Sequence, residues 1–314
     1  MDRMHAAGVK QRLTVALTIA GSDSGGGAGI QADLKTFAAL GVHGASVVTA
    51  LTAQNTQGVR AIHYPPPAIV AAQIEAVRED FAVAAVKIGM LGSAEIVGAV
   101  AKALRGPLTP RPAPTIGVPE GRRSDDGLPG ERGAAFIIYD PVMIASSGEA
   151  LSDTGFVEAV RRELLPFVDC LTPNVAEAAA LLGEKVAGSE DDMARQGAAL
   201  LKLGPRAALM KGGHLDGGEA VDLLATAQGV RRYAAPRIAS NNLHGTGCTL
   251  SSSIAANVVL GMGLPEAVAA AKTFVGEAIE RGREVQLGTG RGPLIQVRLR
   301  GKRRFSGAAS VPAL

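Results

Sequence analysis

Aromatic residues are scarce in this chain, and tryptophan is absent. Aromatics make up 3% of the 314 residues, whereas hydrophobic residues make up 47%. We therefore expect an ordered protein whose core is built from Ala, Val, Leu and Ile. The chain has only two cysteines, which excludes a disulfide framework and favours a reducing, cytoplasmic compartment. It also lacks an apolar run of about 18 residues, so we expect no membrane span. No signal peptide is expected either.

Positive charge is not spread along the sequence. The formal net charge is +3, but it becomes −2 without five residues near the C-terminus, Arg298, Arg300, Lys302, Arg303 and Arg304. We interpret this cluster as a solvated basic tail, because no aromatic residues alternate with it to stack on bases. The pattern therefore predicts no nucleic-acid partner.

Short apolar runs alternate with amphipathic stretches along most of the chain, which favours an α/β protein with a mostly parallel sheet. The strands are expected at 13–20, 47–53, 84–91, 136–143, 170–172 and 207–211, with antiparallel strands at 221–225 and 232–238. Helices are expected at 29–40, 66–80, 154–167, 249–260 and 265–281, with two more helices capped by Ser93 and Ser189. We predict one domain over 1–314, with a core of about 13–295, a surface insertion at 106–133 and a basic tail at 296–314.

A glycine-rich turn follows the first expected strand and spans residues 21–29. Such a turn lets backbone N–H groups and a helix N-terminus face a ligand, although a plain flexible turn has the same composition. Residues 27–32 also fit the dinucleotide pattern G-x-G-x-x-A. That function needs an acidic residue after the second strand. No Asp or Glu occurs between Asp33 and Glu75, which argues against a Rossmann dehydrogenase.

A second glycine-containing turn, His244 to Thr249, opens an apolar helix. The N–H groups of Gly245, Thr246, Gly247 and Cys248 are expected to converge on one anion. At such a terminus we expect a lowered thiol pKa for Cys248. The alternative is a structural turn with a buried cysteine. Neither turn is a Walker loop, because G-x-x-x-x-G-K-[ST] is absent.

Oxygen ligands suited to Mg²⁺ lie beyond the fifth expected strand. Asn174 and Glu177 are three residues apart at the start of a helix and face the same side. The same spacing is also a simple helix cap. Asp140, at the end of another strand and before Pro141, adds a carboxylate. Lys211 ends a further strand and is able to neutralise phosphate, or is an ordinary surface lysine.

These candidates share one position relative to the sheet. Ligands of open parallel sheets bind outside the carboxyl ends of the strands. The glycine turn, Gln54, Met90, Asp140, Asn174 and Lys211 all fall at such strand ends. We therefore predict one site at this edge of the sheet.

At these residues the chain resembles the hydroxymethylpyrimidine/phosphomethylpyrimidine kinase family of the ribokinase-like superfamily. The matching stretches run in family order from about residue 13 to residue 295 and lie at 20–23, 29–37, 52–56, 87–91, 140–143, 171–178, 210–214 and 244–249. The resemblance implies a three-layer α/β/α fold, ATP and Mg²⁺ as cofactors, and two successive phosphorylations in thiamine biosynthesis. We also expect a homodimer.

The resemblance further assigns roles to individual residues. Gln54 would hydrogen-bond the aminopyrimidine, in a pocket lined by Gly21, Asp23, Ala28, Met90 and Val142. The 245–248 loop would form the anion hole, with Cys248 where most ribokinase relatives carry an aspartate base. Asp140, Asn174 and Glu177 would arrange the metal, and Lys211 would contact the phosphates.

Two other functions are compatible with the same fold. A pyridoxal kinase is one, and Cys248 together with Gln54 argues for the pyrimidine instead. A non-catalytic pyrimidine sensor is the other. The sequence argues against a sensor, because it retains residues that a sensor could lose: Asn174, Glu177, Lys211 and the anion-hole glycines.

Overall fold

The computed structural model describes residues 13–105, 135–143, 155–213 and 217–297. The strands in this part form one nine-stranded sheet in the order β3-β2-β1-β4-β5-β6-β7-β8-β9. They are Val15–Asp23 (β1), His43–Asn55 (β2), Gly58–His63 (β3), Val83–Ile88 (β4), Phe136–Tyr139 (β5), Cys170–Leu171 (β6), Ala207–Lys211 (β7), Glu219–Thr226 (β8) and Gly229–Pro236 (β9). The neighbouring pairs β2–β1, β1–β4, β4–β5, β5–β6 and β6–β7 are parallel. The pairs β2–β3, β7–β8 and β8–β9 are antiparallel. The prediction of a mostly parallel sheet is confirmed.

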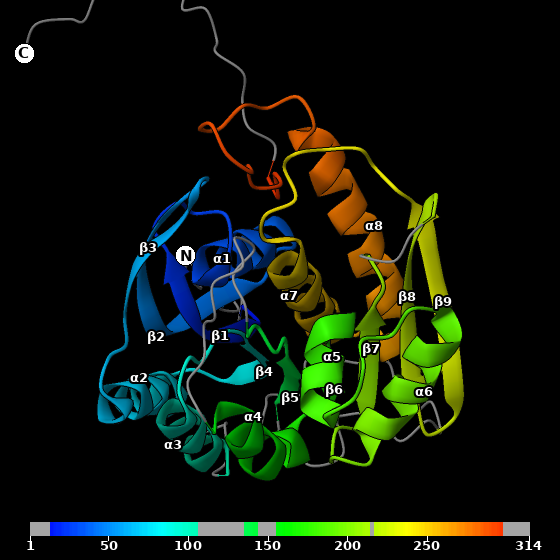
Figure 1. The fold of residues 1–314 in the computed structure, drawn as a ribbon. Coiled ribbons are helices and arrows are strands. Elements are labelled where there is room, and N and C mark those ends of the chain that lie inside the picture. Colours follow the sequence, from blue (N-terminus) through cyan, green and yellow to red (C-terminus); the bar gives the residue numbers. More distant parts are fainter. Residues whose placement is uncertain (1–12, 106–134, 144–154, 214–216, 298–314) are drawn as a thin grey trace, which may run out of the picture.

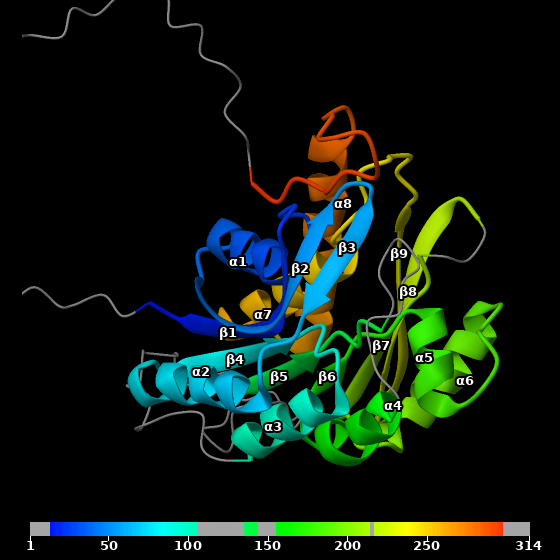
Figure 2. The ribbon, with the colours of Figure 1, turned by 60° about the vertical axis from the view of Figure 1, so that its left-hand side comes forward.

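Helices cover both faces of this sheet (Figures 1 and 2). One face carries α1 (Gly29–Ala39), α7 (Thr246–Val259) and α8 (Leu264–Gly282), and the other carries α2 (Pro67–Asp80), α3 (Ala94–Leu104), α4 (Phe156–Ala159), α5 (Val175–Leu182) and α6 (Glu190–Leu201). Each face has its own core: Phe37 and Ile254 belong to the first, Ile74 and Val97 to the second. Aliphatic side chains dominate both cores, as the composition requires. The three-layer α/β/α prediction is confirmed.

The strand expected at 136–143 and the helix expected at 154–167 differ from the structure, and one strand was not expected. The predicted strand 136–143 is too long, because β5 ends at Tyr139 and Pro141 lacks the N–H that a sheet ladder needs. Within the predicted helix 154–167, Phe156–Ala159 is α-helical, Val160–Leu164 forms a π-helical turn, and Leu165–Phe167 forms a 3₁₀ turn that contains Pro166. β3 was not predicted, because its largely exposed residues give no clear apolar alternation.

Both helix caps expected from serine were predicted correctly. The Ser93 Oγ accepts from the Ile96 N–H, and the Ser189 Oγ accepts from the Asp192 N–H. The single domain stays a prediction. The predicted insertion at 106–133 and residues 298–314 of the basic tail lie outside the described residues. In the described ranges, no helix has the length and apolar character to cross a membrane.

Candidate active site

The carboxyl end of β1 leads into the glycine turn, which the Asp23 side chain organises. Its Oδ1 accepts from the Gly25 N–H at 2.8 Å, and its Oδ2 accepts from the Gly27 and Ala28 N–H groups at 3.0 and 2.9 Å. Burial raises the pKa of Asp23, but hydrogen bonds from His244, Ala28 and Gly25 outweigh it and lower the pKa overall. Asp23 is therefore an anionic anchor for the turn, in addition to its predicted place in the pocket.

A small apolar cluster adjoins this turn. Met90 and Ala50 are buried, and Val142 packs against them with two further side chains, Ile62 and Tyr64. A Cβ at Gly21 would lie 3.2 Å from the Met90 sulfur. The structure thus brings together three residues that the sequence predicted for a pocket: Gly21, Met90 and Val142.

Gln54 connects to the second glycine turn through a histidine. It lies near the end of β2, and its Nε2 is 3.1 Å from the His244 Nε2. The same His244 nitrogen is 3.0 Å from the Asp23 Oδ2. Because His244 directly precedes Gly245, the expected recognition residue and the expected anion-binding turn lie side by side.

The second turn begins α7, with Gly245 as its N-cap. Gly245 has a φ of 87°, and a Cβ there would overlap the Gly27 carbonyl oxygen, so both conformation and space require glycine. The Thr246 N–H was predicted to converge on an anion with its neighbours. In the structure it donates to the Leu243 carbonyl at 3.2 Å, so it is not directed solely at a ligand. The N–H groups of Gly247 and Cys248 lie in the first turn, where a helix supplies no carbonyl partner of its own.

The predicted lowering of the Cys248 thiol pKa is wrong. Burial raises the pKa of Cys248 to about 11; Lys87 and a hydrogen bond from the Gly29 backbone lower it, while Asp33 and Asp140 raise it. The prediction considered the helix dipole and not the loss of water around the sulfur of this half-buried residue. At neutral pH the side chain is a neutral thiol.

This thiol is expected to react slowly with alkylating agents. Compared with an unperturbed thiol of pKa about 8.5, a pKa near 11 lowers the thiolate fraction at pH 8 by more than about 100-fold. Iodoacetamide labelling of Cys248, followed by peptide mass spectrometry, should be slower than in the urea-unfolded chain by that factor. It should also rise about tenfold per pH unit. Rapid labelling that saturates below pH 8 would instead support a thiol pKa below the ordinary value. Cys170 is fully buried and serves as the unreactive internal control.

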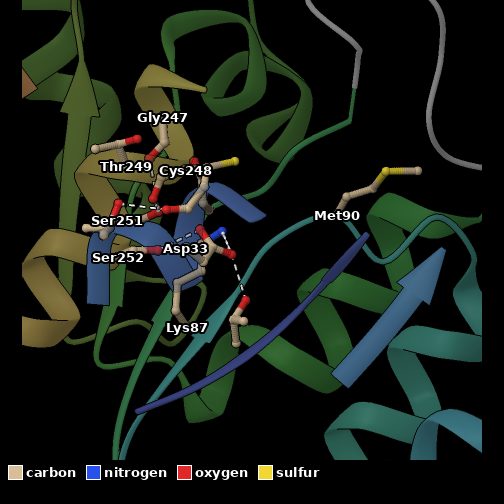
Figure 3. A network of polar contacts seen from close by, with 12 residues as sticks. Asp33, Lys87, Met90, Gly247, Cys248, Thr249, Ser251 and Ser252 are labelled. Atoms are coloured by element: carbon tan, nitrogen blue, oxygen red, sulfur yellow. Dashed lines mark hydrogen bonds and ion pairs between the residues drawn. The ribbon is translucent and has the colours of Figure 1, made fainter. Parts of the chain in front are cut away.

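A buried ion pair lies beneath the first turns of α7 (Figure 3). Lys87 from β4 and Asp33 from α1 are both inaccessible to solvent, and the Lys87 Nζ donates to the Asp33 Oδ2 at 2.9 Å. Asp33 also accepts from the Thr18 hydroxyl at 2.6 Å and from the Ser252 hydroxyl at 2.6 Å. Since removing one partner of such a pair leaves a buried charge, the network fixes α7 against α1 and the sheet.

Lys211, Asp140 and Glu177 form a second charged cluster at the carboxyl ends of β5 and β7. The Lys211 Nζ is 2.6 Å from the Asp140 Oδ1 and 3.7 Å from the Glu177 Oε2. Burial lowers the pKa of Lys211, but the two carboxylates outweigh it and raise the pKa. Burial raises the pKa of Glu177 to about 6, with Lys211 acting in the opposite direction. The alternative of an exposed surface lysine is therefore wrong.

Asn174 and Glu177 do form a helix cap. The Asn174 Oδ1 accepts from the Glu177 N–H at 2.8 Å, and the Glu177 Oε2 accepts from the Asn174 N–H at 2.7 Å. This is a capping box at the start of α5. The cap holds Glu177 beside Lys211, so the structural interpretation and a role in the site are compatible.

One oxygen in this cluster suits a hard cation. The Asp140 Oδ2 is buried and has no hydrogen-bond partner among the described residues. A Cβ at Gly247 would lie 3.3 Å from it, so it faces the first turn of α7. Within the described ranges, no three His, Cys, Asp or Glu side chains gather into a metal-binding group. A site with few protein oxygens fits Mg²⁺, which usually keeps several waters and binds substrate phosphates.

Sequence reasoning placed His244 in the second turn and Thr52 in a matching stretch but gave neither a role. It did not identify the Asp33–Lys87 pair. Thr52 and Gln54 are two residues apart on β2, which places them on one face of the strand. Lys87, a charged residue inside an apolar run, was the one sequence signal for a buried ion pair. Nothing in the sequence indicated the partners of His244, because Asp23 and Gln54 are distant from it along the chain.

Comparisons with known proteins agree with this geometry. The profile described as phosphomethylpyrimidine kinase matches residues 23–111 and 126–295. A hydroxymethylpyrimidine/phosphomethylpyrimidine kinase of Rhizobium meliloti is 48% identical over 280 residues, which is 89% of this chain and 96% of that protein.

Two solved structures share the fold. A phosphomethylpyrimidine kinase of Clostridium difficile matches with a TM-score of 0.68 and 42% identity, over 85% of this chain and 99% of that one. A pyridoxal kinase of Staphylococcus aureus in complex with AMP-PCP and pyridoxal matches with a TM-score of 0.76 and 28% identity, over 91% and 94%. Fold similarity does not decide the substrate. By its profile match and its identity to these relatives, the chain belongs to the phosphomethylpyrimidine kinase family.

Proposed function

We propose that this chain transfers the γ-phosphoryl group of ATP to 4-amino-5-hydroxymethyl-2-methylpyrimidine, and then phosphorylates the monophosphate to the diphosphate, in thiamine biosynthesis. The relatives named hydroxymethylpyrimidine/phosphomethylpyrimidine kinase support both steps, and a plant relative named a thiamine biosynthetic bifunctional enzyme supports the pathway. The observation that carries the proposal is the 3.1 Å contact between Gln54 and His244. It joins the pyrimidine-recognition residue to the turn that would hold the phosphates.

The reaction requires positioning and charge neutralisation more than covalent chemistry. The hydroxymethyl oxygen attacks the γ-phosphorus, the bond from that phosphorus to ADP breaks, and the hydroxyl proton is released. Lys211 supplies positive charge at the carboxyl end of β7. The N–H groups of Gly247 and Cys248 supply a second electropositive element at the start of α7.

Mg²⁺ would be held by Asp140 and Glu177 with Asn174 beside them, and when bound it would offset charge on the phosphates. The neutral Cys248 thiol holds no negative charge before the reaction. In a loose transition state the hydroxyl proton leaves late, so a pre-formed thiolate is not required. Cys248 therefore remains a candidate for contact with the reacting oxygen. Its raised pKa keeps the thiol protonated at neutral pH, which argues against Cys248 as a general base.

The test is turnover with product identification. The purified chain is incubated with ATP, Mg²⁺ and the hydroxymethylpyrimidine, and ADP release and the masses of phosphorylated products are measured. Appearance of the monophosphate followed by the diphosphate supports both steps. Binding of the pyrimidine without ADP release would indicate the sensor instead. Faster turnover of pyridoxal than of the pyrimidine would indicate the pyridoxal kinase, which the similarity to the Staphylococcus aureus enzyme makes a real competitor.

Gln54→Ala is expected to raise the KM for the pyrimidine about 10- to 100-fold, because the ring would lose hydrogen bonds from a partly buried amide. The KM for ATP should stay within about twofold of wild type. Steady-state kinetics with each substrate varied in turn measure both values. Gln57→Ala is the matched control, since Gln57 lies in the next turn and bonds the Thr289 hydroxyl. Equal losses for ATP and pyrimidine would remove Gln54 from the pyrimidine site.

The cytoplasmic location, the homodimer and the absence of a nucleic-acid partner stay predictions. Size-exclusion chromatography with light scattering tests the homodimer directly.

A further inference from the structure

The amide of Gln54 has two chemically different ends, so its orientation matters for recognition. An aminopyrimidine presents a ring nitrogen that accepts a hydrogen bond next to an amino group that donates one. An amide complements this edge only if its N–H faces the ring nitrogen and its oxygen faces the amino group. The inference below rests on the proposed function, in which Gln54 binds this edge.

The hydrogen on the His244 Nε2 is fixed by Asp23. The Asp23 carboxylate already accepts from three backbone N–H groups of the glycine turn, at 2.8 to 3.0 Å. An ionised carboxylate accepts hydrogen bonds and donates none. The His244 Nε2, at 3.0 Å from the Asp23 Oδ2, must therefore carry the hydrogen.

The same nitrogen decides which end of the Gln54 amide faces it. The amide atom placed 3.1 Å from the His244 Nε2 is the Gln54 nitrogen, Nε2. An amide NH₂ there would place a donor against the His244 N–H. Rotation of the amide by about 180° exchanges two groups of nearly equal size and turns the contact into a shared hydrogen bond to the oxygen. His244 therefore favours the Gln54 oxygen on its side.

Thr52 gives the same answer independently. Its Oγ1 lies 2.9 Å from the Ser22 carbonyl oxygen, which only accepts, so the single hydroxyl hydrogen is directed there. The other end of the Gln54 amide, placed as the oxygen Oε1, is 3.2 Å from the same Oγ1, so the same 180° rotation brings the nitrogen there. With its hydrogen in use, the hydroxyl has lone pairs to offer, and the group facing it must be the amide NH₂.

We propose that His244 and Thr52 orient the Gln54 amide, with its oxygen toward His244 and its nitrogen toward Thr52, and that this orientation sets the specificity for the aminopyrimidine. One lone pair of the oxygen and one N–H remain available to the substrate as a donor–acceptor pair. The pair matches the ring nitrogen and the amino group. It opposes a ring in which donor and acceptor are exchanged. His244 and Thr52 thus act as positioning residues through Gln54.

A single-atom change of the substrate tests this orientation. The 4-oxo analogue keeps the size, the methyl group and the hydroxymethyl group of the aminopyrimidine, but it presents a carbonyl and a ring N–H in reversed order. We expect wild type to prefer the aminopyrimidine by about 100-fold or more, because a mismatched pair leaves buried polar groups unpaired. The ratio of Kd values is measured by calorimetry, and the ratio of kcat/KM values by ADP release.

Thr52→Val keeps the shape of the side chain and removes the hydroxyl that holds the amide nitrogen. The preference for the aminopyrimidine is expected to fall about tenfold or more, while the KM for ATP stays within about twofold. Thr52→Ser should restore the preference. Thr36→Val is the matched control, since it makes the same substitution at a hydroxyl that donates to the Ala32 carbonyl within its own helix. His244→Phe keeps an aromatic ring without the N–H and should lower the preference further.

The outcomes separate this inference from the proposed function. Equal binding of both pyrimidines by wild type overturns the inference, whether or not phosphate is transferred. An unchanged preference in folded Thr52→Val and His244→Phe also overturns it. Preferential binding of the aminopyrimidine without ADP release, lost in Thr52→Val, refutes the kinase function and supports the inference.

Discussion

Lys211→Met is expected to lower kcat by about 100- to 1,000-fold, the range found when one preorganised electrostatic group is removed from a transition state. The ammonium lies 2.6 Å from the Asp140 Oδ1 and 3.7 Å from the Glu177 Oε2, so its charge is held at the carboxyl ends of β5 and β7. Methionine fills the same space without charge. Phosphoryl transfer by the variant is measured as ADP release at saturating ATP and pyrimidine.

The same change is expected to destabilise the protein in a pH-dependent way. Without Lys211, the buried Glu177 carboxylate loses its counter-charge, and its pKa, already raised by burial to about 6, rises further. A carboxyl group whose pKa is higher in the folded chain binds protons more tightly there, so stability falls as pH rises from its unfolded value through its folded value. The Tm deficit of Lys211→Met relative to wild type should therefore be larger at pH 8 than at pH 5.5.

Lys211→Arg is the matched control, because it keeps the charge with a different geometry. It should recover most of the Tm and only part of kcat. An unchanged kcat in Lys211→Met, together with a lowered Tm, would make Lys211 a structural counter-ion and remove it from catalysis.

The position of the site was predictable because parallel strands end at one edge. Asp140 and Lys211 are 71 residues apart in sequence and 2.6 Å apart in space, and both were identified from strand ends alone. The rule needs only the order of apolar runs and the residues that follow them. It locates residues along an edge but does not say which side chains touch.

The contacts that the sequence did not reveal depend on three or more segments meeting. Asp33 binds Thr18 from β1, Lys87 from β4 and Ser252 from α7, and none of these pairs has a local sequence pattern. The Cys248 pKa was predicted wrongly for a related reason. The helix terminus is visible in the sequence, whereas the burial that outweighs it belongs to the tertiary structure.

Gly247→Val is expected to lower kcat by about 100-fold or more while the fold is retained. Gly247 lies in the first turn of α7 and is not among the glycines with positive φ, so its backbone accepts any residue. A Cβ there would lie 3.2 Å from the Lys211 Nζ and 3.3 Å from the Asp140 Oδ2. The two further methyl groups of valine would occupy space between the helix terminus and these charged groups. The phosphates would then be unable to approach the N–H groups of the first turn.

Gly245→Ala distinguishes this effect from general disruption of the turn. Gly245 has a φ of 87°, and a Cβ there would overlap the Gly27 carbonyl oxygen, so even alanine should lower the Tm markedly. Gly247→Val should instead keep the Tm within a few degrees of wild type and lose kcat. Wild-type kcat in Gly247→Val would show that the first turn of α7 does not face the transferred phosphate, because a side chain at this position cannot avoid the space beside Lys211 and Asp140.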